Sequence, residues 1–327
     1  MKKGTTSRSP RIGKYPKLAQ IQPSEPALRP NTWIEELIVD LALNSPENRL
    51  HDFGGRPIFG RPLVGIADGE DSLFRTFRRV VGSRHLMPRE VLERPSPKAA
   101  EFKDIRVISW ALPFTNEIRR SNRGRIWPSA LYSVARNNGG ALNFQLSRRL
   151  TEAFQIRGIA AVSPVLLEEY DAYKDPRRVF SSTWSERHAA FASGLGRFGL
   201  NGSIITPAGS HVRLGSIVVD YPFISRRQNK RAYKSRCFET GGEDCGICLK
   251  KCPVKAITEQ GLDKQKCYER RRAIRESHLD EYARKYRLIP SPIAAGGRKY
   301  LGYSLGCALC QCGVPCEGTD PYLLREE

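Results

Sequence analysis

Nine cysteines, all in the last third of a 327-residue chain, constrain this sequence more than any other feature. The densest part reads Cys245-Gly-Ile-Cys248-Leu-Lys-Lys-Cys252-Pro253, which is a C-x2-C-x3-C-P run. The other six lie on both sides of this run: Cys237, Cys267, Cys307, Cys310, Cys312 and Cys316. Such a run, with more cysteines downstream, is typical of proteins that bind two iron–sulfur clusters. In those proteins the cysteine before the proline ligates the other cluster.

Two 4Fe–4S clusters need eight thiolates, because each iron takes one protein ligand. The spacing predicts that the first cysteine set consists of Cys237, Cys245, Cys248 and Cys316. The second cysteine set then consists of Cys252, Cys267, Cys307 and Cys310. Cys312 is left over as a spare buried thiol, and its position would also let it exchange with Cys310 or Cys316.

Disulfides and zinc are the alternative explanations for these cysteines. Disulfides form in oxidising compartments, and the basic N-terminus lacks the apolar run of a secretory signal. Structural zinc is usually held by two separate cysteine pairs, whereas here a third cysteine and a proline follow the first pair. We therefore expect iron–sulfur clusters in a cytoplasmic protein, where thiolates stay reduced.

The charge of the chain permits a polyanionic partner. Fifty-four basic and 34 acidic side chains give a formal net charge of +20. A basic excess of this size raises the expectation of an RNA partner, and a solvated basic surface is the alternative. No RNA-recognition motif accompanies the charge. No stretch of about 18 apolar residues occurs, so we expect no membrane span.

Composition and periodicity divide the chain into three parts. Residues 1–31 are rich in Lys, Arg, Pro and Ser and predict a disordered basic tail. Residues 32–225 predict an α/β domain, and residues 226–327 a ferredoxin-like domain that begins with a basic linker, 226–236. The apolar spacing predicts helices over 33–43, 74–81, 128–150, 183–191 and 268–286, and strands over 63–66, 107–112, 159–162, 203–206 and 213–220.

Three details of this prediction concern turns and breaks. Asp68-Gly-Glu-Asp71 is expected to begin a helix, with its acidic side chains at the positive end of the dipole. Gly139-Gly140 should weaken the long helix in its middle. The strands over 203–206 and 213–220 should pair as a hairpin around Pro207–Ser210.

The stretch Gly194-Leu-Gly196-Arg-Phe-Gly199 matches the pattern GxGxxG. A dinucleotide-binding fingerprint follows a strand and opens a helix, whereas this one follows a predicted helix and opens a predicted strand. We therefore reject dinucleotide binding and expect these glycines to let the backbone lie close to a large ligand.

The glycine-rich stretch and the cysteines together resemble the epoxyqueuosine reductase family and, more distantly, reductive dehalogenases. In that family a helix with a glutamate precedes A-G-L-G-x-x-G, a strand, G-S and L-G. The matching residues here are Glu186, Gly194, Gly196, Gly199, Ile204, Gly209, Ser210, Leu214 and Gly215. Cys267 and the Cys307/Cys310 pair also match in order, and the resemblance spans about residues 60–316.

The resemblance implies a nitroreductase-like α/β domain that binds cobalamin, followed by a two-cluster ferredoxin-like domain that passes electrons to cobalt. It places nine residues at the cobalamin: Gly194, Gly196, Gly199, Asn201, Ser203, Ile204, Ser210, Arg213 and Gly215. It also implies a flavodoxin or ferredoxin as electron donor. The substrate would be a tRNA nucleoside epoxide or, in a dehalogenase-like enzyme, a small molecule with a leaving group.

The chain departs from the family pattern at the proton donor. The family places an aspartate about six residues before the helix glutamate, and the corresponding stretch here, 180–183, has no carboxylate. The catalytic candidates are therefore Glu186 and His188, with Tyr170 or Tyr173 behind them. A packed histidine and a structural ion pair of Glu186 are the alternatives.

Further departures concern the cysteine spacing and the substrate. The spacing widens to C-x7-C at Cys237 and C-x5-C at Cys316, and no helical-repeat tail follows. We therefore expect a paralogue, with its substrate near Glu186 and the arginines between 119 and 125. A two-cluster electron carrier without cobalamin and an RNA-binding protein with structural clusters are the non-enzymatic alternatives.

Overall fold

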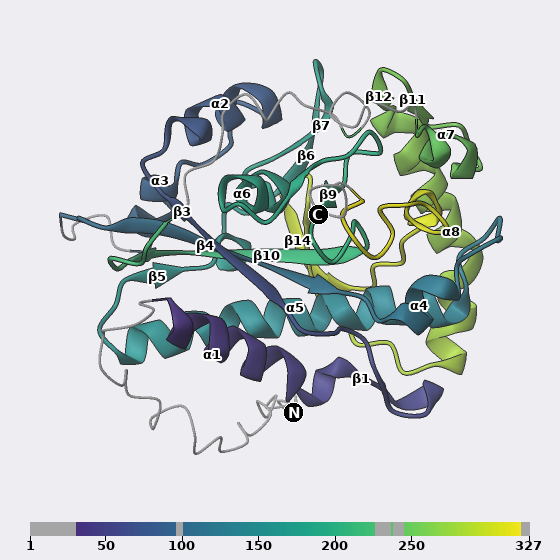
Figure 1. Ribbon diagram of the computed structural model, residues 1–327, viewed down its shortest axis with the longest axis horizontal. Coiled ribbons are helices and arrows are strands. Elements are labelled where there is room, and N and C mark those ends of the chain that lie inside the picture. The colour runs from purple at the N-terminus through teal and green to yellow at the C-terminus, as the bar shows by residue number, and fades with distance from the viewer. Residues whose placement is uncertain (1–30, 96–100, 226–236, 238–244, 322–327) are drawn as a thin grey trace, which may run out of the picture.

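Two long strands, β4 (Ile105–Pro113) and β10 (Val212–Asp220), form the centre of the molecule in the computed structural model (Figure 1). They pair antiparallel along their whole length. β3 (Leu63–Asp68) adds to β4, and β5 (Ala161–Val162) adds to β10, which gives the antiparallel order β3-β4-β10-β5. The structure describes residues 31–95, 101–225, 237 and 245–321.

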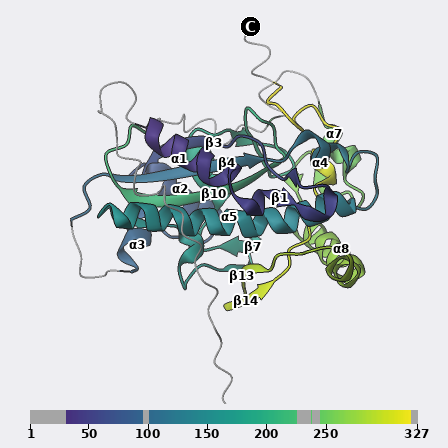
Figure 2. The same ribbon diagram turned by 90° about the horizontal axis from the view of Figure 1, so that it is seen from below.

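Side chains alternate between the two faces of this sheet, as the period of a strand requires. On β10, Ile217 and Val219 belong to one apolar core and Val218 to the other. The first core is covered by two helices, α1 (Thr32–Leu43) and α5 (Ala130–Ile156). The other is covered by three: α2 (Ser72–Val81), α3 (Pro88–Glu93) and α6 (Glu186–Ala192). Figures 1 and 2 show these layers.

Helix α5 runs without a break through Gly139 and Gly140, so the predicted weakening does not interrupt it. A side chain at Gly139 would lie 2.5 Å from the ring of Phe59, and one at Gly140 would lie 3.1 Å from the guanidinium of Arg213. Both glycines therefore make room for groups that pack on the helix. Burial of the helix between the sheet and its neighbours offsets the low helix propensity of glycine.

A second sheet joins segments that are far apart in the sequence. Its order is β14-β13-β6-β7, with the bounds β6 (Ala172–Asp175), β7 (Val179–Ser182), β13 (Ser291–Ala295) and β14 (Arg298–Gly302). The β13–β14 hairpin belongs to the predicted ferredoxin-like part, whereas β6 and β7 belong to the predicted α/β domain. The predicted division of the chain near residue 226 stays a prediction.

The remaining elements are short, apart from α8. The helices are α4 (Asn116–Arg120), α7 (Ile247–Lys251) and α8 (Lys264–Lys285). The strands are β1 (Arg49–Leu50), β2 (Arg56–Pro57), β8 (Arg197–Phe198), β9 (Ile204–Ile205), β11 (Ile257–Thr258) and β12 (Gly261–Leu262). The mixed α/β fold class is confirmed.

The predicted pairing of 203–206 with 213–220 is wrong. β9 pairs with β8 instead, with Phe198 opposite Ile204, and Thr206 and Gly209 form an isolated bridge after it. β4 occupies one edge of β10 along its whole length, and on the other edge β5 pairs only with Val218 and Val219. Gly196 allows the new pairing, because a side chain there would lie 2.1 Å from the carbonyl oxygen of Ile205.

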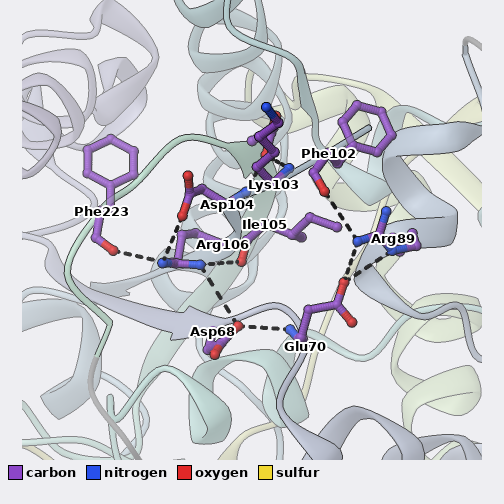
Figure 3. Close-up of polar contacts among 10 residues, drawn as sticks. Asp68, Glu70, Arg89, Phe102, Lys103, Asp104, Ile105, Arg106 and Phe223 are labelled. Atoms are coloured by element: carbon purple, nitrogen blue, oxygen red, sulfur yellow. Dashed lines mark hydrogen bonds and ion pairs between the residues drawn. The ribbon is translucent and has the colours of Figure 1, made fainter. Parts of the chain in front are cut away.

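The acidic turn 68–71 begins α2, as predicted, and its carboxylates pair with arginines (Figure 3). Asp71 caps the helix by accepting a hydrogen bond of 2.8 Å from the backbone N–H of Leu73. Asp68 lies 3.9 Å from Arg106, and Glu70 lies 2.9 Å from Arg89. These contacts indicate that the acidic turn has a structural role, at the start of α2.

Two predicted segments lie outside the described residues: the basic tail, apart from Asn31, and the linker 226–236. Within the described part of the chain, none of the helices combines the length and the apolar character needed to cross a bilayer.

Candidate active site and cysteine clusters

A cavity of about 470 Å³ lies where the central sheet meets the cysteine-bearing loops. Its lining comes from the middle of α5, the start of α6, the β8–β9 turn, the start of β10, α8 and the loop before Leu309. Pockets for small molecules and cofactors commonly enclose about 300–1,000 Å³. The cavity is therefore large enough to be a ligand site.

All four members of the second cysteine set line this cavity: Cys252, Cys267, Cys307 and Cys310. They come from three segments, one after α7, one on α8 and one in the loop after β14. The electrostatic influence of these thiols on one another indicates that their four sulfur atoms lie close together. Burial, followed by the negative charges of the other three, raises the pKa of Cys310 well above its usual range.

The first cysteine set forms a separate group. Burial, followed by the charges of its other three members, raises the pKa of Cys248 to about 12. Burial also raises the pKa of Cys316 to about 11, with smaller contributions from Cys237 and Cys245. Because Cys248 in turn raises the pKa of Cys310, the two groups are neighbours.

Hydrogen bonds to sulfur also fit thiolate ligands. The backbone N–H of Leu200 donates to Sγ of Cys237 at 3.3 Å, and that of Ala256 donates to Sγ of Cys252 at 3.2 Å. Such bonds stabilise the sulfurs of iron–sulfur clusters and help to set their reduction potentials. Among the described residues, no three His, Cys, Asp or Glu side chains are placed to hold one metal ion. A cubic cluster spaces its ligands more widely, since each thiolate binds a different iron.

Cys312 belongs to neither predicted set but lies near the second, since Cys307 contributes to its raised pKa. It is buried, its Sγ lies 3.7 Å from Nδ1 of His211, and it donates to the carbonyl of Ala308 at 3.3 Å. Burial raises its pKa to about 12, with Glu317 as the next contribution. Its predicted role as a spare thiol stays a prediction.

Glu186 lines the cavity from the first turn of α6. Its Oε2 accepts a hydrogen bond of 2.6 Å from the hydroxyl of Ser216, which in turn accepts one of 2.9 Å from the indole of Trp184. Burial raises the pKa of Glu186 to about 7, although Ser216 and Arg213 act in the opposite direction. Roughly half of these carboxyls are therefore protonated at neutral pH, which suits a proton donor.

His188 is not among the residues that line the cavity. Its ring packs against Phe77 and Phe198, with centroids 4.9 Å away in both cases, and its Nδ1 lies 2.7 Å from the hydroxyl of Ser185. Burial lowers its pKa well below the usual value. It is thus a packed, neutral histidine, and its predicted catalytic role stays a prediction.

Five of the nine residues predicted to contact cobalamin line the cavity: Asn201, Ser203, Ile204, Ser210 and Arg213. Gly194, Gly196, Gly199 and Gly215 are not among the described lining residues. At two of them the close neighbours belong to the chain itself, since side chains there would meet Ile205 and the ring of Trp110. These two glycines allow packing between strands and within the β8–β9 hairpin.

The arginines predicted near the substrate, 119–125, are also absent from the lining. Arg123 pairs with the buried Glu317 at 2.6 Å, and Arg119 donates to the backbone carbonyl of the same residue at 3.4 Å. They hold the loop that follows Cys316. Tyr170 lines the cavity, whereas Tyr173 does not.

Arg136 and Gly202 are among the lining residues that the sequence reasoning missed. Gly202 has a φ of +74°, and the dipeptide Asn201-Gly202 is a turn signal that could have identified it. Arg136 lies on an otherwise buried face of α5, and a charge in such a position is itself a signal of function.

Comparison with known proteins finds similarity to solved structures. No family model and no curated protein matches the sequence. The solved structures include an epoxyqueuosine reductase with an epoxyqueuosine-modified tRNA stem loop, at 18% identity and a TM-score of 0.40, covering 72% of this chain and 56% of that one.

The chain is similar to epoxyqueuosine reductases. The Bacillus subtilis epoxyqueuosine reductase has 18% identity and a TM-score of 0.42, and the similarity covers 89% of this chain and 70% of that one. The catabolic reductive dehalogenase NpRdhA has 15% identity and a TM-score of 0.40, with 73% of this chain and 33% of that one covered. This chain thus spans little more than half of the tRNA-bound epoxyqueuosine reductase and a third of the dehalogenase.

The cysteines present fit the implied clusters, and an implied cobalamin would have to lie in the cavity beside them. Eight thiols in two groups of four provide the donor set of two 4Fe–4S clusters. The cavity is of cofactor size and shares a wall with the second cysteine set. A redox cofactor in this cavity would therefore lie next to that set.

Proposed function

We propose that this protein is a cobalamin- and iron–sulfur-dependent reductase that resembles epoxyqueuosine reductase. One observation carries the proposal: a single cavity is lined by four cysteines suited to a cluster and by a carboxyl whose pKa is about 7. Such a cavity brings an electron source and a proton source to the same bound molecule.

The arrangement of the two cysteine sets suggests the direction of electron flow. Cys245, in the first set, is exposed, so a flavodoxin or ferredoxin could approach that set. Cys248 and Cys310 influence each other's set electrostatically, and the second set borders the cavity. Electrons would therefore enter at the first set and leave at the second.

Cobalamin, when bound, supplies a low-valent cobalt that is a strong nucleophile and reductant. The chain's own residues would hold and orient the molecules in the cavity. Asn201 shapes the turn beside it, because its Oδ1 accepts hydrogen bonds from the N–H and the hydroxyl of Ser203. Arg187 supports the same turn by donating to the carbonyl of Gly202 at 2.6 Å.

Glu186 would deliver the proton that a reduction at an oxygen leaving group requires. The hydroxyl of Ser216 holds the carboxyl in position, and the indole of Trp184 holds the hydroxyl. A carboxyl with a pKa of about 7 can donate its proton at neutral pH and recover it from water in the cavity.

We propose a tRNA nucleoside epoxide as the substrate, favoured by the net charge of +20, in a cytoplasmic enzyme. Reductive removal of a leaving group from a small molecule is the second enzymatic candidate, because the cavity is of small-molecule size. A plain electron carrier would need no such cavity next to its clusters.

The test is the absorption spectrum and metal content of anaerobically purified protein after incubation with cobalamin. We expect about eight irons per chain and a base-off corrinoid spectrum that persists through gel filtration. Iron–sulfur absorption without retained cobalamin would identify an electron carrier and refute the proposal. Binding of tRNA with a steep salt dependence, but without retention of cobalamin, would identify an RNA-binding protein.

A further inference from the structure

Two arginines on different elements converge on the cavity. Arg136 comes from α5 and Arg213 from β10, and both line the cavity. Each packs against a glycine. A side chain at Gly140 would lie 3.1 Å from Nη2 of Arg213, and one at Gly306 would lie 3.1 Å from Cγ of Arg136. The absence of a side chain at these two positions leaves space for both arginines.

Among the described lining residues, one carboxyl, that of Glu186, lies near these two arginines, and it raises the pKa of Arg213, which burial lowers. Five arginines line the cavity beside this one carboxyl. The buried Nη1 of Arg136 has no hydrogen-bond partner in this part of the chain. Burial, followed by the positive charge of Arg213, lowers the pKa of Arg136 to about 9. Leaving buried charges unpaired destabilises a fold, so a partner from outside the chain would relieve the cost.

Iron–sulfur clusters are negatively charged, but other arginines are better placed to balance them. Arg271 and Arg187 lower the pKa of Cys267, and Arg270 lowers that of Cys307. Arg136 and Arg213 are not among the main contributors to the pKa shifts of these two thiols, which leaves the pair available to a ligand in the cavity.

Neutral hydrogen-bond donors also line the cavity. The hydroxyl of Ser147 lines the cavity and is buried without a partner among the described residues. Burial raises the pKa of Tyr170, another lining residue, to about 12, so its hydroxyl stays protonated. Two guanidinium groups with neutral donors around them match the acceptor oxygens of an oxyanion.

We propose that Arg136 and Arg213 form an anion subsite, which takes a phosphate or carboxylate group of the molecule bound in the cavity. This inference goes beyond the reductase proposal, because it concerns the chemical class of the ligand and needs neither iron nor cobalt. The anion would come from one of two sources. One is the phosphate in the nucleotide tail of a corrinoid, and the other is an anionic group of the substrate.

The first test is calorimetric titration with inorganic phosphate of the wild type, Arg136→Met and Arg213→Met. Arg148→Met is the matched control, because Arg148 also lies on α5 but is exposed and pairs with Glu152 at 3.3 Å. We expect each cavity variant to bind phosphate at least about tenfold more weakly, because charge-assisted hydrogen bonds are lost, and the control to bind like the wild type. Absence of phosphate binding to the wild type, or equal binding by all variants, would overturn the subsite.

Thermal unfolding without ligand separates a binding role from a structural one. Methionine keeps most of the apolar contacts of arginine, so removal of an unpaired buried charge should leave the melting temperature unchanged or raise it. Phosphate should raise the melting temperature of the wild type more than that of Arg213→Met. A lower melting temperature of Arg213→Met without phosphate, together with an undiminished phosphate effect, would show a purely structural arginine.

A second pair of titrations identifies the source of the anion. Cobinamide lacks the nucleotide tail and its phosphate. Weaker binding of cobalamin but not of cobinamide by Arg213→Met assigns the subsite to the corrinoid tail, whereas weaker binding of phosphate alone assigns it to the substrate. A chain that retains cobalamin but binds phosphate independently of both arginines refutes only the subsite. A chain that binds phosphate through them but holds neither iron nor cobalamin refutes only the reductase proposal.

Discussion

Replacing Glu186 by glutamine should remove a pH dependence that this one carboxyl imposes on folding. The pKa is about 7 in the folded chain, against an ordinary value of 4.5. Between these two pH values the unfolded chain releases the proton and the folded chain keeps it. The protonated carboxyl therefore stabilises the fold at low pH, and this stabilisation is lost as the pH rises through about 7.

The size of the effect follows from the two pKa values. One pH unit corresponds to about 1.4 kcal/mol for a group that binds a proton in one state only. A rise in pH from 4.5 to about 7 therefore lowers the free energy of unfolding of the wild type by about 3 kcal/mol. Water in the cavity screens the carboxylate, which makes this an upper value. Glutamine has the same shape and no ionisable proton, so the variant does not lose this stability as the pH rises.

The assay is chemical denaturation of wild type and Glu186→Gln at matched pH values from 4.5 to 8.5. The difference in unfolding free energy between the two should change by up to about 3 kcal/mol in favour of the variant, and should level off above pH 7. Subtraction removes the contributions of the buried histidines, which both proteins share. A difference that does not change with pH would refute the reasoning, because it would mean that the folded carboxyl titrates at its ordinary pKa. Turnover should fall in the wild type above pH 7 and be largely lost in the variant.

The remaining predictions concern the clusters, the glycines and the hydrogen bond to the carboxyl. Cys248→Ala should lower the iron content by about four atoms per chain, whereas Cys312→Ala should leave it unchanged; equal iron in both variants would contradict the assignment. Gly196→Ala should cost about 1–3 kcal/mol in chemical denaturation because it forces backbone apart, while Gly60→Ala, which meets no atom within 4 Å, should be nearly neutral. Ser216→Ala removes a donor to the carboxylate, so the pKa should rise and the alkaline limb of turnover should move to higher pH; an unmoved profile would exclude this carboxyl as the proton donor.

Much of the central fold could be predicted from periodicity. The apolar runs within 107–112 and 213–220 predict the two central strands, and both are present within longer strands. The apolar spacing of 128–150 predicts the long helix, which extends to Ile156. Local pattern suffices here, because each of these elements buries a regular face against the sheet.

The pairing of the strands and the convergence of side chains on the cavity could not be predicted in the same way. The β9 strand was expected beside β10 and lies beside β8, where Gly196 lets the backbone approach Ile205 closely; local patterns do not determine such long-range pairing. His188 and Glu186 are two residues apart on α6, yet only Glu186 lines the cavity. Residues separated by two positions on a helix point in different directions, and the packing of that helix decides which one faces the cavity.

The sequence by itself determined the number and spacing of the thiols and predicted their division into two sets. The tertiary structure alone decided that Glu186, Arg136 and Arg213 meet at one cavity beside the second cysteine set. The physical reason is the range of the interactions involved. A loop of a few residues constrains its own cysteines, whereas side chains from α5, α6 and β10 are brought together only by burial of the apolar faces of the central sheet.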